Sequence, residues 1–379
     1  MTFGRQTLDF DGEEVHGETP FAVLESRGET GFWQDLRARL RAAKQKYPDG
    51  AAIGFVGYEA TRSLDPRAFP ISRPDDLALP LARLVFYKRL IRQKKPARDL
   101  SKPLALRPLP DWPAARRFYE NGVETIREFI AAGDIYQANL TRRFSLETPF
   151  SAAQIYARLQ TLGVAPRAAL LEWPDFSLIS NSPETFLTLK NGVLEAKPIK
   201  GTMRRGQTPA EDEDLRRELE NSAKNRAENV MIVDLMRNDL GRVCEFGSVC
   251  VPKLFDIEPY PTLHHGVSTV RGQLRGDCDA LDAFLAAFPC GSITGAPKIR
   301  AMQILNVLEP APRGAAMGAI GYFGFGGDME WNVAIRTATL MGNRAHFHVG
   351  GGIVADSDPA DEYEEMRLKA RALYSALTC

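Results

Sequence analysis

The sequence predicts an α+β protein in which large antiparallel β-sheets pack as a sandwich, with helices on the outside. Short β-prone runs are joined by tight turns, and the clearest of these turns are Asn191-Gly192 and Gly342-Asn343. Strands and helices do not alternate regularly, as they would in a βαβ fold with parallel sheets. A chain of 379 residues is also long enough to bury a large core.

The amino-acid composition indicates an ordinary globular protein. Hydrophobic residues make up 44% of the chain and charged residues 25%, which is typical of globular proteins. The net charge is zero, so we expect no nucleic acid or membrane partner. The sequence has no membrane-spanning apolar run and no signal peptide, which predicts a cytoplasmic protein. The cysteines lack CxxC spacing, which favours reduced thiols; they are Cys244, Cys250, Cys278, Cys290 and Cys379.

Two parts are expected along the chain. Residues 1–105 should form an N-terminal subdomain that is intertwined with a core formed by residues 113–379. The pattern predicts a helix over Gly31–Lys46 and a buried strand over Ala51–Tyr58. Residues 91–112 are rich in Pro, Lys and Arg, and we interpret them as a linker.

The core should begin with a helix from about Ala114 to Gly133, because glycine is favourable just after a helix. A strand is expected next, over Asp134–Leu140. Capping residues and helical spacing predict the later helices, and β-prone runs predict the later strands. The helices are expected from Thr208, at Ser222–Leu240, at 280–288 and at Asp358–Leu377; the strands are expected at about 260–275, Ala319–Phe325, Trp331–Leu340 and Arg344–Val349.

A carboxylate and an amine, Glu184 and Lys200, flank the Asn191-Gly192 turn. A hairpin at this turn brings the two groups toward each other. Such a pair is usually a solvated salt bridge, whereas a pair that faces one cavity could serve chemistry that needs both groups.

The geometry of the turn decides between these alternatives. With a two-residue turn, Lys200 pairs with Pro183 and points away from Glu184. With a three-residue turn, Lys200 pairs with Ser182 and shares the face of Glu184. Pro198 cannot donate a ladder hydrogen bond, so a bulge near it would also restore the shared face.

Other polar residues have two interpretations each. The stretch Gly291–Lys298 is not a Walker A loop, because Pro297 precedes its lysine. It is either a tight turn before a helix or a turn that offers N–H groups and hydroxyls to an anion. On the last helix, Glu362, Glu365 and Lys369 flank the apolar stripe, either as surface charges or as ligands for Mg²⁺. Glu228 is a further ligand or a half-exposed salt-bridge partner.

Arg336 falls on an otherwise apolar face of its predicted strand, which is unusual, and arginine suits bidentate carboxylate binding. Glycines at 350–352 allow a ligand to approach the backbone closely. His264 and His265 are adjacent, so a strand would point them to opposite faces, and each alone suits a structural role.

Together these segments resemble the chorismate-utilising enzymes, which include anthranilate, aminodeoxychorismate, isochorismate and salicylate synthases. The resemblance covers about residues 113–379 and implies the fold of anthranilate synthase component I, with the site between sheet and helices. Val23–Ser26 is similar to the tryptophan-binding segment of the feedback-regulated members. The matching stretches are Asp134–Leu140, Ser182–Glu184, Pro198–Thr202, Ala227–Asp239, Phe288–Lys298, Gly350–Asp358 and Glu362–Lys369.

Two positions imply a branch of the family. Aminodeoxychorismate synthases typically have a lysine where Lys200 lies, and anthranilate and salicylate synthases have alanine there. Isochorismate and salicylate synthases carry a lysine at the position of Gln137. The resemblance therefore favours the large subunit of aminodeoxychorismate synthase, in para-aminobenzoate and folate synthesis. Anthranilate synthase component I and a catalytically silent chorismate-binding subunit are the alternatives.

The resemblance also implies roles. Glu184 would protonate the departing C4 hydroxyl of chorismate, and Lys200 would attack C2 before ammonia enters at C4. His265 matches the family's active-site histidine. Mg²⁺ would be held by Glu228 and Glu365, with Glu362 nearby. The implied substrate-binding residues are Gln137, Gly201, Thr202, Ser292, Arg336, Gly350, Gly351, Gly352 and Lys369.

A partner is also expected, because nothing in the chain looks like a glutamine amidotransferase. Ammonia would come from a separate glutamine amidotransferase subunit. Two positions depart from the family pattern: Ala316 replaces an aromatic residue that helps to bind substrate, and Asn225 replaces an acid near the metal.

Overall fold

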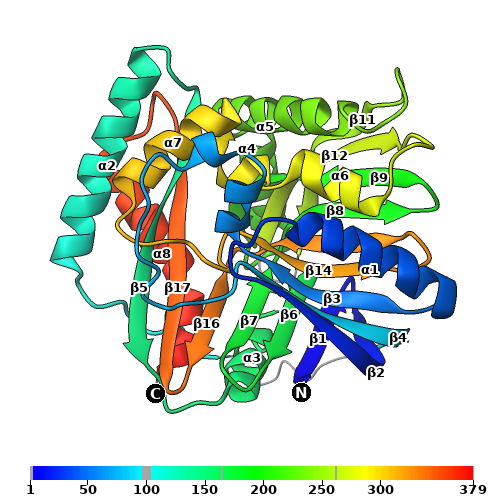
Figure 1. Cartoon of the computed structure of the whole chain (residues 1–379). Coiled ribbons are helices and arrows are strands. Elements are labelled where there is room, and N and C mark those ends of the chain that lie inside the picture. The colour runs from blue at the N-terminus through cyan, green and yellow to red at the C-terminus, as the bar shows by residue number, and fades with distance from the viewer. Residues whose placement is uncertain (1–2, 96–103, 164, 261–262, 379) are drawn as a thin grey trace.

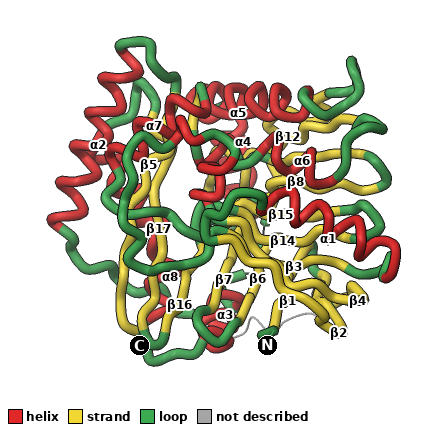
Figure 2. The backbone as a smooth tube through the Cα atoms, in the orientation of Figure 1, coloured by secondary structure: helices red, strands yellow, loops and turns green. Residues whose placement is uncertain are grey.

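All strand pairings in the computed structural model are antiparallel, and the described strands join one continuous network. The structure describes residues 3–95, 104–163, 165–260 and 263–378. In Figure 2 the helices lie around the strands, which confirms the predicted α+β class with antiparallel sheets. Among the described residues, no helix is both long and apolar enough to span a membrane.

The N-terminal strands add to the sheet rather than forming one of their own. The first strand, β1 (Arg5–Phe10), pairs with β6 (Arg167–Glu172), and β3 (Ala51–Val56) pairs with β14 (Ala319–Gly324). Every residue of β3 is buried, as its apolar run predicts. The remaining strands in this part are β2 (Glu13–Ser26) and β4 (Ala82–Lys94).

The other strands come from the second part of the chain. In Figure 1, β5, β16 and β17 run steeply, whereas β3, β8 and β14 run across the view. The bounds are β5 (Gln137–Glu147), β7 (Ser177–Ser182), β8 (Thr185–Lys190), β9 (Val193–Lys197), β10 (Ile199–Arg204), β11 (Cys250–Pro259), β12 (Leu263–Gln273), β13 (Gly295–Ala296), β15 (Met329–Val333), β16 (Thr337–Met341) and β17 (Arg344–Ile353).

Capping residues set the helix starts largely as predicted. Thr208, Ser222 and Asp358 each accept a hydrogen bond from a first-turn N–H group of the helix that follows. The helices are α1 (Phe32–Lys46), α2 (Pro113–Ala131), α3 (Ala152–Gln160), α4 (Pro209–Glu220), α5 (Ala223–Gly241), α6 (Ala280–Ala287), α7 (Lys298–Leu308) and α8 (Pro359–Leu377), with 3₁₀ turns at Tyr58–Ser63, Pro66–Ala68 and Gly291–Ile293.

Two helices bring the C-terminal and central segments together. The apolar stripe of α8 is buried against β17 and α2, and α5 packs on β10 and β12. Residues of these elements carry most of the polar groups that the sequence singles out, so this packing positions the candidate site.

The central hairpin has a two-residue turn together with a bulge. Lys190 pairs directly with Val193 across Asn191-Gly192, and both turn residues have positive φ, as a type I′ turn requires. The register then shifts by one residue, so that Thr185 faces Lys197. If this register were extended beyond the paired residues, Lys200 would fall opposite Ser182, on the face that Glu184 shares. A bulge accompanies the two-residue turn, as predicted, but the predicted place near Pro198 was wrong. The bulge lies within β8, and the pairing with β12 runs through Pro198 without a shift.

A second irregularity occurs at Lys200 itself. Strand β10 pairs with β12 through Ile199 and Val267, and then through Thr202 and His265, which leaves one extra residue in β10. Gly201 has φ +82°, a conformation that suits glycine in a bulge. The bulge lets Lys200 leave the regular ladder.

Three details of the sequence prediction were wrong. The predicted strand Trp331–Leu340 breaks between β15 and β16, where Arg336 has φ +50°, because β15 pairs with β8 and β14 whereas β16 pairs with β7 and β17. The edge strand β11 was not predicted, since its residues are mostly exposed and show no clean alternation. Residues 91–94, assigned to a linker, continue β4, and residues 96–103 lie outside the described part.

The turn of the central hairpin generates a stability prediction. Gly192→Ala should lower the free energy of unfolding by about 1–2 kcal/mol, because alanine is strained at φ +79°. Its β-carbon would also lie 2.7 Å from the amide nitrogen of Gln273. Urea unfolding measures the change. Gly276→Ala is the control, since nothing lies within 4 Å of a β-carbon there; equal unfolding midpoints for both variants would contradict the turn geometry.

Candidate active site

Glu184 is a buried acid between β7 and β8, with 4% of its surface exposed. Burial raises the pKa of its carboxyl group to about 7, although the Ser292 hydroxyl, the Lys200 ammonium group and the Ile199 N–H group oppose the rise. Arg336 also favours the charged form. One carboxyl oxygen, Oε1, has no hydrogen-bond partner among the described residues. The group is therefore poised to exchange a proton near neutral pH.

The backbone around Glu184 is fixed on both sides. The Glu184 N–H group donates to Ser182 Oγ at 3.2 Å, and its carbonyl accepts from Val333 N at 3.1 Å. The Ser182 hydroxyl donates in turn to the Val333 carbonyl at 2.6 Å. These bonds tie the acid to the end of β15, close to the break that contains Arg336.

Lys200 faces the opposite wall of the same site. A β-carbon built on Gly352 would lie 3.4 Å from Lys200 Nζ and 2.1 Å from Gln137 Nε2. Only glycine therefore lets β17 approach both polar groups. Gln137 is 1% exposed, and its Oε1 has no hydrogen-bond partner among the described residues. Buried polar atoms without partners are unusual in a folded protein, so this oxygen is a candidate contact for a polar ligand.

The glycine strand continues toward α8. A β-carbon on Gly351 would lie 3.3 Å from Lys369 Nζ and 3.5 Å from Glu362 Oε2. Lys369 Nζ donates to the Gly350 carbonyl at 3.3 Å and pairs with Glu365 at 2.7 Å. The structure thus brings the three glycines, the acids of α8 and its lysine to one edge of the site.

Three carboxylates approach each other here. Burial raises the pKa of Glu228 on α5, and the neighbouring charges of Glu362 and Glu365 add to the rise. Glu362 is buried, accepts from Ser357 Oγ at 2.7 Å and lies 3.6 Å from Lys224 Nζ. Within residues 3–95, 104–163, 165–260 and 263–378, no three His, Cys, Asp or Glu side chains converge as a ready-made metal site. The donor set is nevertheless of the oxygen type that Mg²⁺ prefers.

Ser292 reaches the site from the 3₁₀ turn Gly291–Ile293. The Thr294 hydroxyl closes this turn by donating to the Cys290 and Gly291 carbonyls. Lys298, at the start of α7, donates to Asp239 and the Ala287 carbonyl, so it is a structural lysine. The tight turn before a helix is confirmed, whereas binding of an anion by this stretch stays a prediction. Ser292 is the residue of the turn whose hydroxyl acts on the Glu184 carboxyl group.

The two adjacent histidines have different surroundings. His265 lies 2.9 Å from Thr202 Oγ1 and packs against the Tyr260 ring, and burial lowers its pKa to about 4. The imidazole is therefore neutral at physiological pH. His264 points the other way and lies 3.0 Å from Asp212 Oδ1. Opposite orientations are what a strand predicts for neighbouring residues.

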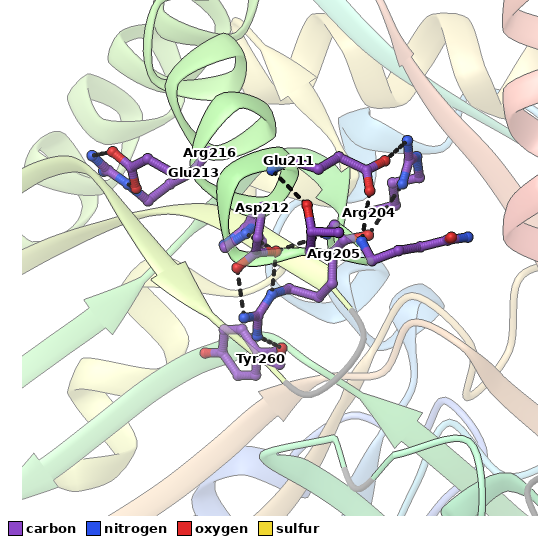
Figure 3. A network of polar contacts seen from close by, with 11 residues as sticks. Arg204, Arg205, Glu211, Asp212, Glu213, Arg216 and Tyr260 are labelled. Atoms are coloured by element: carbon purple, nitrogen blue, oxygen red, sulfur yellow. Dashed lines mark hydrogen bonds and ion pairs between the residues drawn. The ribbon is translucent and has the colours of Figure 1, made fainter.

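Asp212 belongs to a polar network between β10 and α4. Figure 3 shows Arg205 against Asp212, with Tyr260 beside it. Arg205 donates twice to Asp212, at 2.8 and 2.7 Å, and once to the Tyr260 carbonyl at 2.9 Å. The network closes the loop that follows Lys200 and Thr202, and it holds that loop on α4.

Sequence reasoning missed several residues of the site. Lys224 lies beside Glu362, Ser357 fixes Glu362, and Tyr119 lies 3.5 Å from a β-carbon built on Gly351. Tyr119 sits on the buried face of α2, and Lys224 precedes Glu228 by one helical turn. That spacing was the available signal for Lys224. The described cysteines are free thiols; Cys290 lies 3.3 Å from Ser292 Oγ, and burial raises its pKa to about 12.

Comparisons with known proteins identify the family of the chain. A family model described as chorismate binding enzyme matches residues 108–375. Aminodeoxychorismate synthase component 1 of Bacillus subtilis (strain 168) is 46% identical over 68% of this chain and 55% of that protein. Anthranilate synthase component 1 of Geobacillus stearothermophilus is 37% identical over 95% of this chain and 85% of the relative.

A solved structure shares the fold. Anthranilate synthase component I from Streptococcus pneumoniae TIGR4 superposes with a TM-score of 0.81 and 28% identity, over 96% of this chain and 92% of that one. The chain spans only 29% to 55% of the length of four aminodeoxychorismate synthases that it matches.

The buried acid generates a prediction about pH and stability. Below the ordinary carboxyl pKa of 4.5 both folded and unfolded chains hold the Glu184 proton, and above about 7 neither does. Between these values the folded state binds more protons, so this group lowers stability as pH rises. Glu184→Gln should therefore gain up to about 3 kcal/mol relative to the unsubstituted protein between about pH 4 and pH 8.

Urea unfolding at a series of pH values measures this gain. Glu124→Gln, at an exposed position of α2, is the matched control and should show no trend with pH. A flat difference between Glu184→Gln and the unsubstituted protein would contradict the raised pKa.

Proposed function

The chain belongs to the family of chorismate binding enzymes, and on that basis we propose that it is the chorismate-binding subunit of an aminodeoxychorismate synthase. Its product would be 4-amino-4-deoxychorismate, made from chorismate and ammonia for para-aminobenzoate and folate synthesis. The observation that carries the proposal is that Glu184 and Lys200 lie close enough for the Lys200 charge to lower the pKa of Glu184, at a site that also holds the buried Gln137. The aminodeoxychorismate synthases among the relatives support the same branch.

The pair supplies an acid and a nucleophile for one displacement. Lys200 first passes its ammonium proton to the Glu184 carboxylate. The neutral amine then attacks C2 of chorismate, the ring double bond shifts, and the C4–O bond breaks. Glu184 gives its proton to the departing hydroxyl, which leaves as water, and receives the proton that the lysine nitrogen loses. Its unpartnered Oε1 is the oxygen available for this transfer.

Ammonia completes the exchange. As ammonia bonds to C4, the double bond shifts back and the C2–N bond breaks. Glu184 protonates the departing lysine nitrogen and takes up the proton that the new amine sheds, so the amine and acid are restored. Burial, which raises the pKa of Glu184 to about 7, suits a group that gives and receives a proton in each half of the cycle.

Positive groups around the pair would hold the carboxylates of chorismate. Arg336 is close enough to Glu184 to affect its charge, and Lys369 lies at the Gly351 edge. The backbone at Gly350–Gly352, together with Gly201, Thr202 and Ser292, would line the remaining surface. His265 is uncharged and hydrogen-bonded to Thr202. Because its pKa is lowered, it would not act as a general acid near pH 7, and it would serve instead as an uncharged hydrogen-bonding group.

The three carboxylates fit Mg²⁺. Burial raises the pKa of Glu228, the charges of Glu362 and Glu365 add to the rise, and a divalent cation would relieve their repulsion. Glu228 and Glu365 would hold the ion with Glu362 nearby, and Mg²⁺ supplies charge neutralisation for a substrate carboxylate when bound. We further propose that ammonia comes from a separate glutamine amidotransferase subunit and that the protein is cytoplasmic.

Anthranilate synthase component I is the second candidate, because the chain covers 85% of one such relative. That reaction would release pyruvate and an aromatic product. Lys200 favours the first candidate, since a covalent exchange at C2 uses an amine that the anthranilate reaction does not need. A silent chorismate-binding subunit is a third possibility, and the intact Glu184–Lys200 pair argues against it.

Product identification tests the function directly. Chorismate, an ammonium salt and Mg²⁺ should give 4-amino-4-deoxychorismate, measured by mass spectrometry, without the fluorescence of anthranilate. Anthranilate as the product would contradict the proposal in favour of the second candidate. Failure to consume chorismate with any ammonia source would favour the silent subunit.

The metal assignment is tested on α8. Glu362→Gln should raise the Mg²⁺ concentration for half-maximal activity roughly 10-fold or more, because a buried carboxylate near the cation is lost. Glu364→Gln is the matched control, since Glu364 is exposed on the same helix and pairs with Arg116 and Arg367. Equal Mg²⁺ dependence in the two variants would refute the assignment, and chelation of the metal should abolish the activity of the unsubstituted protein.

A further inference from the structure

A buried ion pair lies behind the turn that carries Ser292. Arg313 is 3% exposed, and its guanidinium donates to both carboxyl oxygens of Glu309, at 2.8 and 2.6 Å. Its charge lies over the Tyr58 ring, 4.4 Å from the centroid. Burying this charge lowers the stability of the fold unless all its donors find partners, so the groups that the remaining donors reach indicate what Arg313 does.

The remaining donors of Arg313 reach two segments of the candidate site. Nη1 donates to the Ile293 carbonyl at 2.7 Å, and Nη2 donates to the Asn139 carbonyl at 2.7 Å. Ile293 is the residue after Ser292, and Asn139 lies two residues after Gln137 on β5. The Asn139 N–H group also donates to the Thr294 carbonyl at 2.9 Å. One guanidinium therefore joins the turn and the strand that present both polar side chains.

Two acids from different parts of the chain, Glu309 and Glu59, hold Arg313 in place. Glu309 Oε1 accepts from the backbone N–H and the hydroxyl of Thr141, at 2.8 and 2.9 Å. Glu59, in the N-terminal part of the chain, accepts from Arg313 N and Gly314 N, each at 2.8 Å. Bonds from both parts of the chain thus fix the guanidinium in place.

The fork of the guanidinium is essential to this geometry. Arginine presents donors in a planar, rigid arrangement, whereas a lysine ammonium is a single point charge on a flexible stem. A lysine at 313 could retain the charge pairing with Glu309 but could not span both carbonyls with the same geometry. Substitution by lysine would therefore loosen the turn without leaving an unpaired buried carboxylate.

We propose that Arg313 is a positioning residue, which acts through the Gly291–Ile293 turn to hold Ser292 against Glu184 and thereby aligns the acid for proton transfer. The inference rests on the proposed function of Glu184 as the acid. Arg313 acts on the turn and on β5, and Ser292 and Gln137 are the groups through which its effect reaches the substrate.

Kinetics of Arg313→Lys test the proposal. We expect kcat to fall roughly 10- to 100-fold, with KM for chorismate changed by less than about threefold, because proton transfer is misaligned while the charged binding groups stay in place. Ser292→Ala should lose a similar factor. The double variant should then be no more than about threefold slower than the slower single variant, since both act through one contact. Activity of Arg313→Lys within twofold of the unsubstituted protein, or losses that multiply, would overturn the proposal.

The titration of Glu184 gives a second readout that needs no turnover. The Ser292 hydroxyl lowers the pKa of Glu184, so loosening it should move the carboxyl titration to higher pH in Arg313→Lys. Difference infrared spectroscopy follows the carboxyl band, identified by its loss in Glu184→Gln. An unchanged titration in Arg313→Lys would contradict the proposal. If the unsubstituted protein consumes no chorismate, the proposed function fails, but this titration still decides whether Arg313 controls the acid.

Two further variants distinguish a positioning role of Arg313 from a general loss of stability. Arg158→Lys is the matched control, because Arg158 also donates to backbone carbonyls, those of Ser375, Ala376 and Thr378, at the far end of α8. It should leave kcat and the Glu184 titration unchanged. Should Arg313→Lys fail to fold, Glu59→Gln retains the guanidinium and weakens only its backbone anchor. Glu59→Gln should move the titration in the same direction by a smaller amount, and an unchanged titration there would also overturn the proposal.

Discussion

A carboxyl group buried without a full set of partners is the interaction on which the candidate site depends. Glu184 is almost inaccessible, one of its oxygens has no partner among the described residues, and burial holds its pKa at about 7. Such a group lowers the stability of the folded state above neutral pH. The surrounding structure tolerates it because the Lys200 and Arg336 cations and the Ser292 hydroxyl favour the charged form. Enzymes commonly contain groups that lower the stability of the folded state at the functional site, and the neighbouring structure compensates for that loss.

Irregular backbone is what aligns the acid and the amine. A regular hairpin with the observed two-residue turn would place Glu184 and Lys200 on opposite faces, and the bulge in β8 reverses that outcome. The bulge at Gly201 then releases Lys200 from the ladder, and the absence of a side chain at Gly352 leaves room for both Lys200 Nζ and Gln137 Nε2 beside β17. Two bulges and a run of glycines therefore bring Glu184 and Lys200 to one site, which regular strands with this turn would not do.

Local sequence signals predicted the parts of the fold that local chemistry determines. Thr208, Ser222 and Asp358 begin helices because their side chains cap them, and Asn191-Gly192 makes the turn that its positive φ values demand. The break at Arg336 could not be predicted, because it arises where the chain passes between strands that pair with different neighbours. The antiparallel class and the sharing of one face by Glu184 and Lys200 were predicted. The Arg313 network was not, since its partners Glu59, Asn139, Ile293 and Glu309 are far apart in sequence.

The central claim is that Glu184 and Lys200 act together on one substrate, with Lys200 as the nucleophile. Intact-mass analysis after acid quench of the protein with chorismate and Mg²⁺, without ammonia, tests it most directly. The account predicts a covalent adduct on the protein that is absent in Lys200→Ala and present in Lys197→Ala, where a neighbouring, half-buried amine is removed. Formation of the aminated product by the unsubstituted protein with no adduct at any time point would contradict the account and indicate direct amination.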